Sequence, residues 1–209
     1  IFAGEVDIRV IEEFRKQSIP VVLVNNYLDM DGLVCISADH YGGAVQATEY
    51  LCKLGHCKIG LLSGRFSPQV SEARIEGFVK TLAKYDIPVD DRFIADIEPA
   101  LEDGEEIMTR MLREVDRPTA FFCTNDTIAA GAMKAVTRAG LRVPEDIAII
   151  GFDDSYISRV VEPELTTVRI DAAKMGCLAM QTLFDLIAGM PVEKAHIQIP
   201  TELIVRGTA

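Results

Sequence analysis

The stretch "TAFFCTNDTIAAGAMKAV", residues 119–136, decides the fold class of this chain. An apolar run at residues 120–123 ends in Thr-Asn-Asp, and small and apolar residues then recur at helical spacing. A buried strand that passes through a short polar turn into a helix is the first half of a strand–helix–strand unit. The stretch therefore predicts an α/β protein in which helices cover a parallel sheet.

The same alternation continues along the whole chain. Short runs rich in Val and Ile predict strands at residues 1–3, 20–24, 33–37, 58–63, 93–97, 120–123, 147–152 and 166–170. Longer amphipathic stretches predict helices at residues 7–17, 43–54, 70–85, 104–115, 126–138 and 172–188. Most predicted strands are apolar on both faces, which is typical of parallel strands between two helix layers.

The two polar residues at the centre of the opening stretch have different predicted roles. Asp126 is predicted to be the N-cap of the helix, because its carboxylate can accept hydrogen bonds from the free N–H groups of the first turn. Asn125 is then available to face a ligand, although an asparagine in a tight turn commonly has no such role.

Composition and charge exclude several classes of protein. The chain has 209 residues, of which 49% are hydrophobic and 25% charged, an ordinary globular composition. No apolar run approaches the roughly 20 residues that cross a bilayer, and the first residues lack the pattern of a signal peptide, so we expect no membrane contact and a cytoplasmic location. The net charge of −11 argues against direct DNA binding by this segment.

Cysteine and histidine do not form a metal-binding pattern. The five cysteines are an odd set, typical of free thiols in a reducing compartment. Cys52 and His56 are four residues apart on one predicted helix face, with Cys57 beside them, but a metal site needs three or four ligands and the remaining histidines add no matching pair. We predict no metal and no cofactor.

Sequence signatures of catalysis are absent. There is no GxGxxG after a strand, no GxxxxGK[ST], no HExxH and no GxSxG. Asp153 and Asp154 are adjacent, so their side chains diverge along an extended chain and do not make an acid and base pair. The sequence indicates a binding protein and not an enzyme.

Polar residues follow most predicted strands, where ligands bind in open parallel sheets. They are Asn25 and Asn26, Gly64 and Arg65, Glu98, Asn125 and Asp126, and Asp153 and Asp154. Each also has an ordinary structural role open to it. Asp154 could cap the segment that follows while Asp153 faces a ligand, and Arg74, on the next helix after "LSGRFSPQV", could be a surface arginine.

Several of these segments together resemble the effector-binding core of the lactose-repressor/galactose-repressor family of bacterial transcription regulators. The resemblance rests on "IPVVLVNN" (19–26), "SEARIEGF" (71–78), "PTAFFCTNDTIAAGAMKAV" (118–136), "GLRVPEDIAIIGFDD" (140–154) and "PTELIVRGT" (200–208), and it covers nearly all of the chain. It implies a two-lobed, periplasmic-binding-protein-like α/β fold that binds a small effector between its lobes and thereby alters operator affinity.

The resemblance also implies a division of the chain. Residues 1–39 and 171–193 correspond to the N-terminal lobe, and residues 40–170 and 194–209 to the C-terminal lobe. A strand at residues 1–3 with nothing before it leaves the first lobe thin. We therefore expect a fragment whose first lobe is incomplete and that lacks the helix-turn-helix headpiece and hinge, through which family members bind operator DNA as dimers.

Six positions match effector-binding positions of the family: Arg74, Asn125, Asp153, Asn25, Phe122 and Val70. By this resemblance Arg74 reaches effector hydroxyls or carboxylates, and Phe122 lines the pocket. Near Glu98, where some members place a stacking tryptophan, this chain has no aromatic residue. Fixed donors and acceptors suit vicinal hydroxyls, so we expect a sugar or sugar derivative as the effector.

The main alternative is an extracytoplasmic solute-binding protein of a transporter, which shares the fold. Five free thiols and the segment "GLRVPEDIAIIGFDD" favour the regulator. An enzyme on the same fold is a third hypothesis, without a recognisable nucleophile or metal set.

Overall fold

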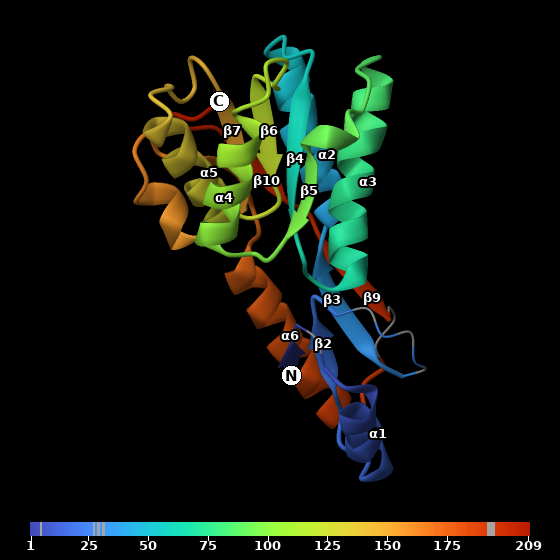
Figure 1. Ribbon diagram of the computed structural model, residues 1–209. Coiled ribbons are helices and arrows are strands. Elements are labelled where there is room, and N and C mark those ends of the chain that lie inside the picture. The colour runs from blue at the N-terminus through green and yellow to red at the C-terminus, as the bar shows by residue number, and fades with distance from the viewer. Residues whose placement is uncertain (5, 27, 29, 31, 192–194) are drawn as a thin grey trace. The chain divides into compact units, whose positions relative to one another are not determined.

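The computed structural model describes residues 1–4, 6–26, 28, 30, 32–191 and 195–209. The chain divides into two compact units, each with its own sheet (Figure 1). Residues 1–39 and 171–200 form the first unit, and residues 40–170 and 201–209 form the second. The chain therefore passes from one unit to the other three times.

The second unit is built on a six-stranded sheet in the order β10-β8-β7-β6-β4-β5. Its strands are β4 (Ile59–Gly64), β5 (Ile94–Ile97), β6 (Ala120–Cys123), β7 (Ala148–Asp153), β8 (Thr166–Arg169) and β10 (Glu202–Ile204). All neighbours run parallel except β10, which is antiparallel to β8. The carboxyl ends of the parallel strands therefore lie along one edge of the sheet.

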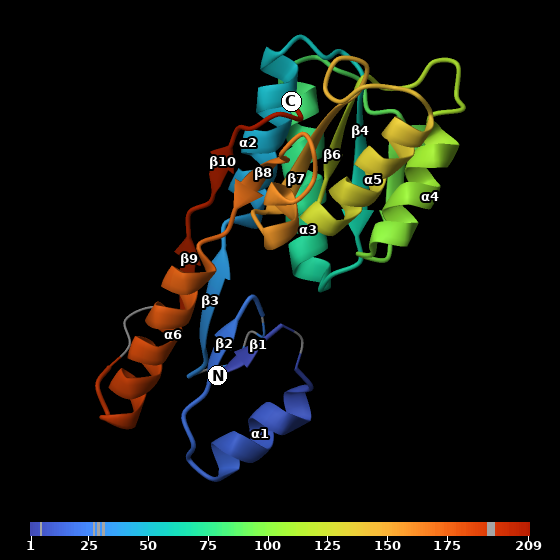
Figure 2. The same ribbon diagram turned by 90° about the vertical axis from the view of Figure 1, so that its left-hand side faces the viewer.

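Two helix pairs cover the two faces of this sheet (Figure 2). On one face lie α2 (His40–Lys53) and α3 (Pro68–Lys84), and on the other lie α4 (Leu101–Met111) and α5 (Asp126–Arg138). Two short 3-10 helices, η1 (Asp91–Phe93) and η2 (Tyr156–Arg159), complete the unit.

Alternation along the strands fills both layers of the core. In β6, Ala120 and Phe122 belong to the cluster with α2 and α3, whereas Phe121 and Cys123 belong to the cluster with α4 and α5. Successive side chains of a strand point to opposite faces, so a strand that is apolar at every position can be buried on both. Each fully buried phenylalanine contributes about 1.5–3 kcal/mol to this core.

The first unit has a four-stranded sheet in the order β1-β2-β3-β9, with all neighbours parallel. Its elements are β1 (Phe2–Ala3), α1 (Ile8–Lys16), β2 (Val22–Val24), β3 (Val34–Ala38), α6 (Ala172–Ile187) and β9 (His196–Ile199). Ile11 of α1 packs with Leu23 and Cys35 on one face of the sheet. Helix α6 contacts β2 and β3. Asp7 and Asp171 cap α1 and α6 with their carboxylates.

The predicted fold class is confirmed: this is an α/β protein with mainly parallel sheets flanked by helices. Each of the eight predicted strands is found, with ends that differ by at most two residues. The predicted starts of α2 and α4 are three residues late, at Gly43 and Gly104 instead of His40 and Leu101. Glycine is a poor helix former, but both glycines lie at a close approach to neighbouring groups, so packing overrides propensity.

The end of the chain differs from the predicted division. The predicted boundary at residues 193 and 194 lies outside the described residues, and residues 196–199 do not join the second unit as predicted. They form β9, which pairs with β3 from Cys35 to Ala38, and the chain returns to the second unit at Thr201. Pairing between segments more than 150 residues apart leaves no local signal in the sequence.

None of the helices in the described ranges is both long and apolar enough to cross a bilayer. The five cysteines all lie in the described ranges and form no disulfide; Cys35 and Cys123 are buried, while Cys57 and Cys177 are exposed.

Candidate functional site

The candidate site lies at the carboxyl edge of the sheet in the second unit. It is formed around Arg74 of α3, Asn125 in the turn after β6, and Asp153 at the end of β7. These residues come from separate βα segments, and the parallel strand order brings them to one edge.

Arg74 is buried and not a surface arginine, since only 3% of its side chain is exposed. Its guanidinium donates to the carbonyl oxygen of Thr124. Nε and Nη2 lie 3.4 and 3.2 Å from Nδ1 of His40, and Nη2 lies 3.4 Å from Oδ1 of Asp153. A guanidinium has five N–H donors in a fixed plane, so these contacts fix its orientation.

Aromatic rings complete the surroundings of this guanidinium. Its central carbon lies 3.9 Å from the ring centroid of Phe152 and 5.0 Å from that of Phe66. Phe122 lies behind Phe152, with ring centroids 6.3 Å apart, and is fully buried in the core. The rings supply cation–π attraction and shield the charge from water.

His40 acts as a neutral partner of Arg74. Burial, and then the charge of Arg74, lower the pKa of His40 to about 3. Because Nδ1 accepts from the guanidinium, the single proton of the neutral ring resides on Nε2. Within the described residues, Nε2 is buried without a hydrogen-bond partner. The histidine therefore orients the arginine without repelling it.

Asp153 is the member of the pair that reaches solvent, with 38% of its side chain exposed. Burial raises its pKa to about 6; the charge of Arg74 opposes this rise, and the nearby Asp126 adds to it. The backbone at Asp153 has φ 109°, a conformation that residues with side chains rarely adopt. A partly exposed carboxylate beside a buried arginine can accept hydrogen bonds from a polar ligand.

The N-cap of α5 is Asn125 and not Asp126, the residue predicted to cap this helix. Asn125 is the N-cap, and its Oδ1 accepts from the N–H of Ile128 at 2.8 Å. Asp126 is the first helical residue, and its carboxylate accepts from the N–H of Ser155 at 2.6 Å and the hydroxyl of Thr167 at 2.5 Å. Asp126 already belongs to the helix, and its carboxylate is bound by these partners on β8 and in the loop after β7.

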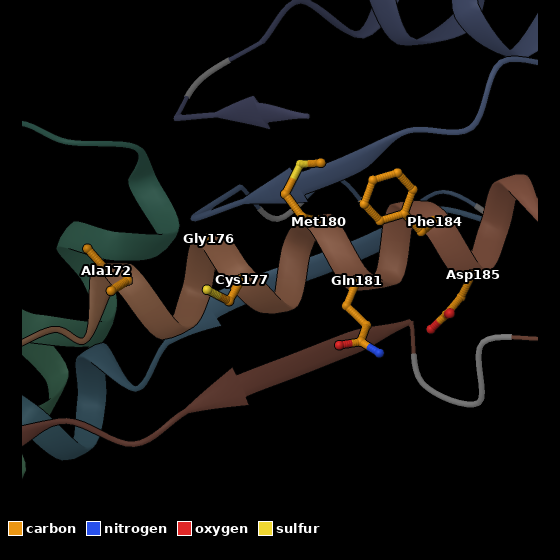
Figure 3. A pocket seen from close by; sticks show the side chains of 8 residues that line it. Ala172, Gly176, Cys177, Met180, Gln181, Phe184 and Asp185 are labelled. Atoms are coloured by element: carbon orange, nitrogen blue, oxygen red, sulfur yellow. The ribbon is translucent and has the colours of Figure 1, made fainter.

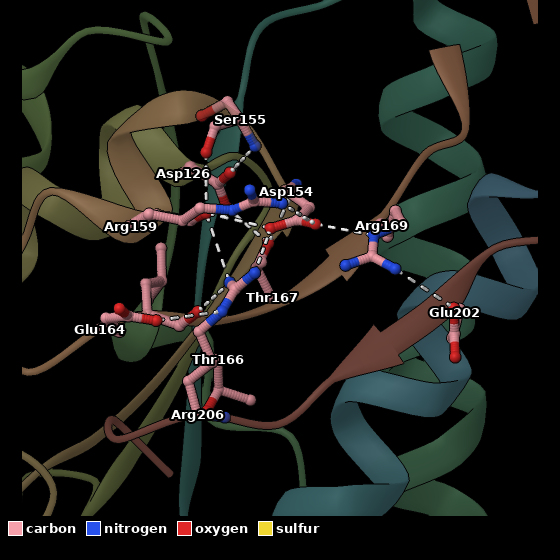
Figure 4. Close-up of polar contacts among 12 residues, drawn as sticks. Asp126, Asp154, Ser155, Arg159, Glu164, Thr166, Thr167, Arg169, Glu202 and Arg206 are labelled. Atoms are coloured by element: carbon pink, nitrogen blue, oxygen red, sulfur yellow. Dashed lines mark hydrogen bonds and ion pairs between the residues drawn. The ribbon is translucent and has the colours of Figure 1, made fainter. Parts of the chain in front are cut away.

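Asp154 also differs from its predicted role, because it caps no helix. Its carboxylate is buried, with 3% of the side chain exposed, and accepts from Arg206, Arg169 and Ser158 (Figure 4). Burial alone would raise the pKa of Asp154, but these hydrogen bonds hold it below its ordinary value. Asp154 thus joins β7, β8 and the C-terminal segment.

The remaining predicted site residues lie in different surroundings. Val70 is buried in α3, one turn before Arg74. Asn25 belongs to the first unit, where it has φ 50° and its Oδ1 accepts from the N–H of Ala38 at 3.1 Å. Five of the six predicted residues therefore belong to the second unit, and Asn25 belongs to the first.

Sequence reasoning missed His40, Phe152 and Arg206 as parts of this edge. The contact between His40 and Arg74 spans 34 positions. The contact between Arg206 and Asp154 spans 52. No motif relates residues so far apart in the sequence.

A separate hollow in the first unit is lined by residues of α6. Met180 and Phe184 lie on one side of the helix, and Gln181 and Asp185 on the other (Figure 3). None of the predicted effector-binding residues lines this hollow. Among the described residues, no cluster of three or more His, Cys, Asp or Glu side chains could hold a metal ion.

Comparison with known proteins identifies the family of this chain. Residues 48–209 match the family described as "Periplasmic binding protein-like domain". The chain is 34% identical over 203 residues to the probable HTH-type transcriptional repressor ExuR of Bacillus subtilis (strain 168), covering 97% of this chain and 61% of ExuR. The chain thus spans less than two thirds of that relative, which is named as a repressor and not as an enzyme.

Solved structures show the same fold. A regulatory protein of the LacI family from Chloroflexus aggregans has a TM-score of 0.89 and 31% identity, covering 98% of this chain and 73% of its own. A LacI family transcriptional regulator from Enterococcus faecium, solved with bound ribose, has a TM-score of 0.88 and 26% identity, covering 97% and 75%. The chain belongs to the LacI family of transcriptional regulators and corresponds to its periplasmic binding protein-like, effector-binding core.

Proposed function

We propose that this chain is the ligand-sensing domain of a DNA-binding transcriptional regulator and that its effector is a sugar or sugar derivative. The family membership supports the regulatory role, and the chemistry of the site supports the effector class. Operator DNA would be bound by a headpiece outside this chain, in agreement with the net charge of −11.

The observation that carries the proposal is the pairing of Arg74 with Asp153. A buried guanidinium offers fixed donors, and the carboxylate 3.4 Å away offers acceptors. Vicinal hydroxyls of a sugar both donate and accept, so they can bridge such a pair. Asn125 lies at the same edge, and because its Oδ1 caps α5 it would contribute through its amide N–H groups.

The proposed mechanism uses both lobes. Asn25 of the first unit would contact the effector from the second wall of the site. A ligand that binds two lobes favours the relative arrangement in which both contacts form, and it shifts the population toward that arrangement. In a dimer, this shift would change the spacing of the headpieces and hence the affinity for operator DNA.

The effector can be identified by a thermal-shift screen of this chain against pentoses, hexoses, uronic acids, disaccharides and nucleosides. D-Ribose belongs in the screen because a related regulator was solved with bound ribose. A ligand present at 100 times its Kd should stabilise the folded state by about 2.7 kcal/mol. Stabilisation by nucleosides alone would contradict the proposed sugar class.

Calorimetry with variants then tests the site. We expect Arg74→Ala and Asp153→Ala to weaken the binding of the identified sugar at least tenfold, since each leaves a polar partner unsatisfied, at a cost of about 1–3 kcal/mol. Arg142→Ala is the matched control, because Arg142 pairs with Asp146 on the exposed surface of the same unit. Affinities of both site variants within a factor of two of wild type would show that the site is misplaced.

A further inference from the structure

The turn that carries Asp153 has an unusual backbone. Asp153 and Asp154 have φ values of 109° and 51°, so two consecutive residues with side chains occupy positive φ. Such conformations cost free energy and persist only where the surroundings enforce them. Most of the contacts that can enforce this turn involve Asp154.

Four side chains with N–H or O–H donors surround the carboxylate of Asp154. Arg206 Nη2 lies 2.5 Å from Oδ1, Arg169 Nε lies 2.7 Å from Oδ2, and Arg159 Nη2 lies 3.6 Å from Oδ2. The hydroxyl of Ser158 donates to Oδ1 at 3.1 Å. The donors come from β8, η2 and the segment after β10, so they fix the carboxylate from three directions (Figure 4).

Hydrogen bonds of the neighbouring backbone N–H groups also fix the turn. The N–H of Asp154 lies 3.4 Å from the hydroxyl of Thr167, which itself donates to Asp126. The next N–H, that of Ser155, donates to the other carboxylate oxygen of Asp126. Arg206 also donates to the carbonyl oxygen of Leu165 at 2.7 Å. The turn is therefore held at consecutive residues, 154 and 155, while the carboxylate of Asp153 is directed toward Arg74.

We propose that Asp154, clamped by Arg206 and Arg169, is a positioning residue of the effector site that maintains the left-handed turn presenting Asp153 to Arg74 and to the ligand. The inference rests on the proposed function in that Asp153 is taken as an effector contact. The competing view is that the clamp only ties the C-terminal segment to the sheet and leaves Asp153 unaffected.

The test uses two variants that alter the local charge in opposite directions. Asp154→Asn removes a negative charge, and Arg206→Met removes a positive one, but both weaken the same clamp. Electrostatics alone would therefore shift the pKa of Asp153 down in the first variant and up in the second. If the clamp positions Asp153, both variants release its carboxylate toward water, and its pKa falls in both.

The measurement is an NMR titration of carboxyl-labelled aspartate in the ligand-free chain. Asp153 also interacts with Arg74 of α3 and Asp126 of α5, and His40 of α2 lies against Arg74; none of these three groups is altered. We expect the pKa of Asp153 to be about 6 in the wild type and to move toward its ordinary value of 3.8 in both variants. Arg206→Lys should restore part of the shift, and Asp146→Asn, in an exposed pair, should leave it unchanged.

Opposite shifts in the two variants, or no shift in either, would overturn the inference. Thermal unfolding of each variant shows that it is folded at the temperature of the titration. If Arg206→Met does not fold, Arg169→Met provides the same sign test, because Arg169 is partly exposed and contacts the same carboxylate. The titration needs no ligand, so it can fail while effector binding by Arg74 and Asp153 is confirmed, and it can succeed where the sugar screen fails.

Discussion

At the residue scale, the two members of each polar pair at a strand end contact different partners. Asn125 caps α5, while Asp126 reaches across to Thr167 and Ser155. Asp153 faces Arg74, while Asp154 is buried among arginines. Neighbouring residues in these turns direct their side chains to different partners, so one member of each pair can join a structural network while its neighbour serves another purpose.

The raised pKa of Asp153 predicts a pH-dependent affinity. Its ionised carboxylate accepts hydrogen bonds from the proposed sugar more strongly than the protonated group does, so we expect the affinity to be highest well above pH 6 and to fall as the pH decreases through this value. At pH 5, one unit below the pKa, we expect the association constant to fall by up to about tenfold. Calorimetry from pH 5 to 8 measures this, and Asp153→Asn should give weaker but pH-independent binding.

Stability provides a second readout with a defined sign. The pKa of Asp153 is higher in the folded chain than its ordinary 3.8, so between these values the folded state binds more protons than the unfolded state. The contribution of this residue to the free energy of unfolding is therefore lost as the pH rises through about 6. A contribution that instead increases with pH over this range, obtained by comparing wild type with Asp153→Asn, would contradict this assignment.

At the element scale, close helix contacts hold the layers of the second unit together. Gly131 of α5 lies against α4, where an added Cβ would come within 2.1 Å of the carbonyl oxygen of Leu101. Gly104 of α4 lies similarly close to the backbone of Ile128. These two glycines let α4 and α5 approach each other, and α5 then presents the turn with Asn125 at the sheet edge.

The close packing predicts opposite effects for the same substitution in two helices. Gly131→Ala should lower the free energy of unfolding by about 1–3 kcal/mol, because overpacking outweighs the better helix propensity of alanine. Gly176→Ala in α6 is the matched control, since an added Cβ there has no atom within 4 Å. It should stabilise the chain by about 0.5–1 kcal/mol. Urea unfolding followed by circular dichroism measures both, and a stabilising Gly131→Ala would disprove the packing argument.

At the scale of the whole molecule, the chain crosses between the two units at residues 39–40, 170–171 and 200–201. The second unit contains the Arg74–Asp153 pair, the clamp on Asp154 and both large core clusters. Its only discontinuity is between Ile170 and Thr201, where β8 and β10 run antiparallel with Arg169 opposite Glu202. The second unit should therefore fold without the first.

This independence can be tested by joining residues 40–170 to residues 201–209 through an Asn-Gly turn, which suits a two-residue antiparallel connection. We expect a cooperative unfolding transition, since this unit has its own core. We expect sugar affinity to fall at least tenfold, because only one of the two proposed walls is present. Binding as tight as that of the whole chain would show that Asn25 and the first unit contribute nothing to affinity.

Three features could be predicted from the sequence alone: the α/β class, the existence and approximate limits of eight strands, and the family. Strands buried on both faces and helices with one apolar face are local patterns, because each is set by periodicity over a few residues. The polar residues at strand ends could be predicted as site candidates because the carboxyl edge of a parallel sheet is where ligands bind.

The partner that each polar residue contacts depends on the tertiary structure and could not be predicted from the sequence. The prediction that Asp126 caps α5 was wrong because the groups that bind its carboxylate, in Ser155 and Thr167, lie 29 and 41 positions away. The burial of Arg74, its contact with His40, the clamp on Asp154 and the pairing of β9 with β3 all join segments distant in the sequence. Local propensity determines where an element forms, whereas the partner of a buried polar group is determined by which elements pack together.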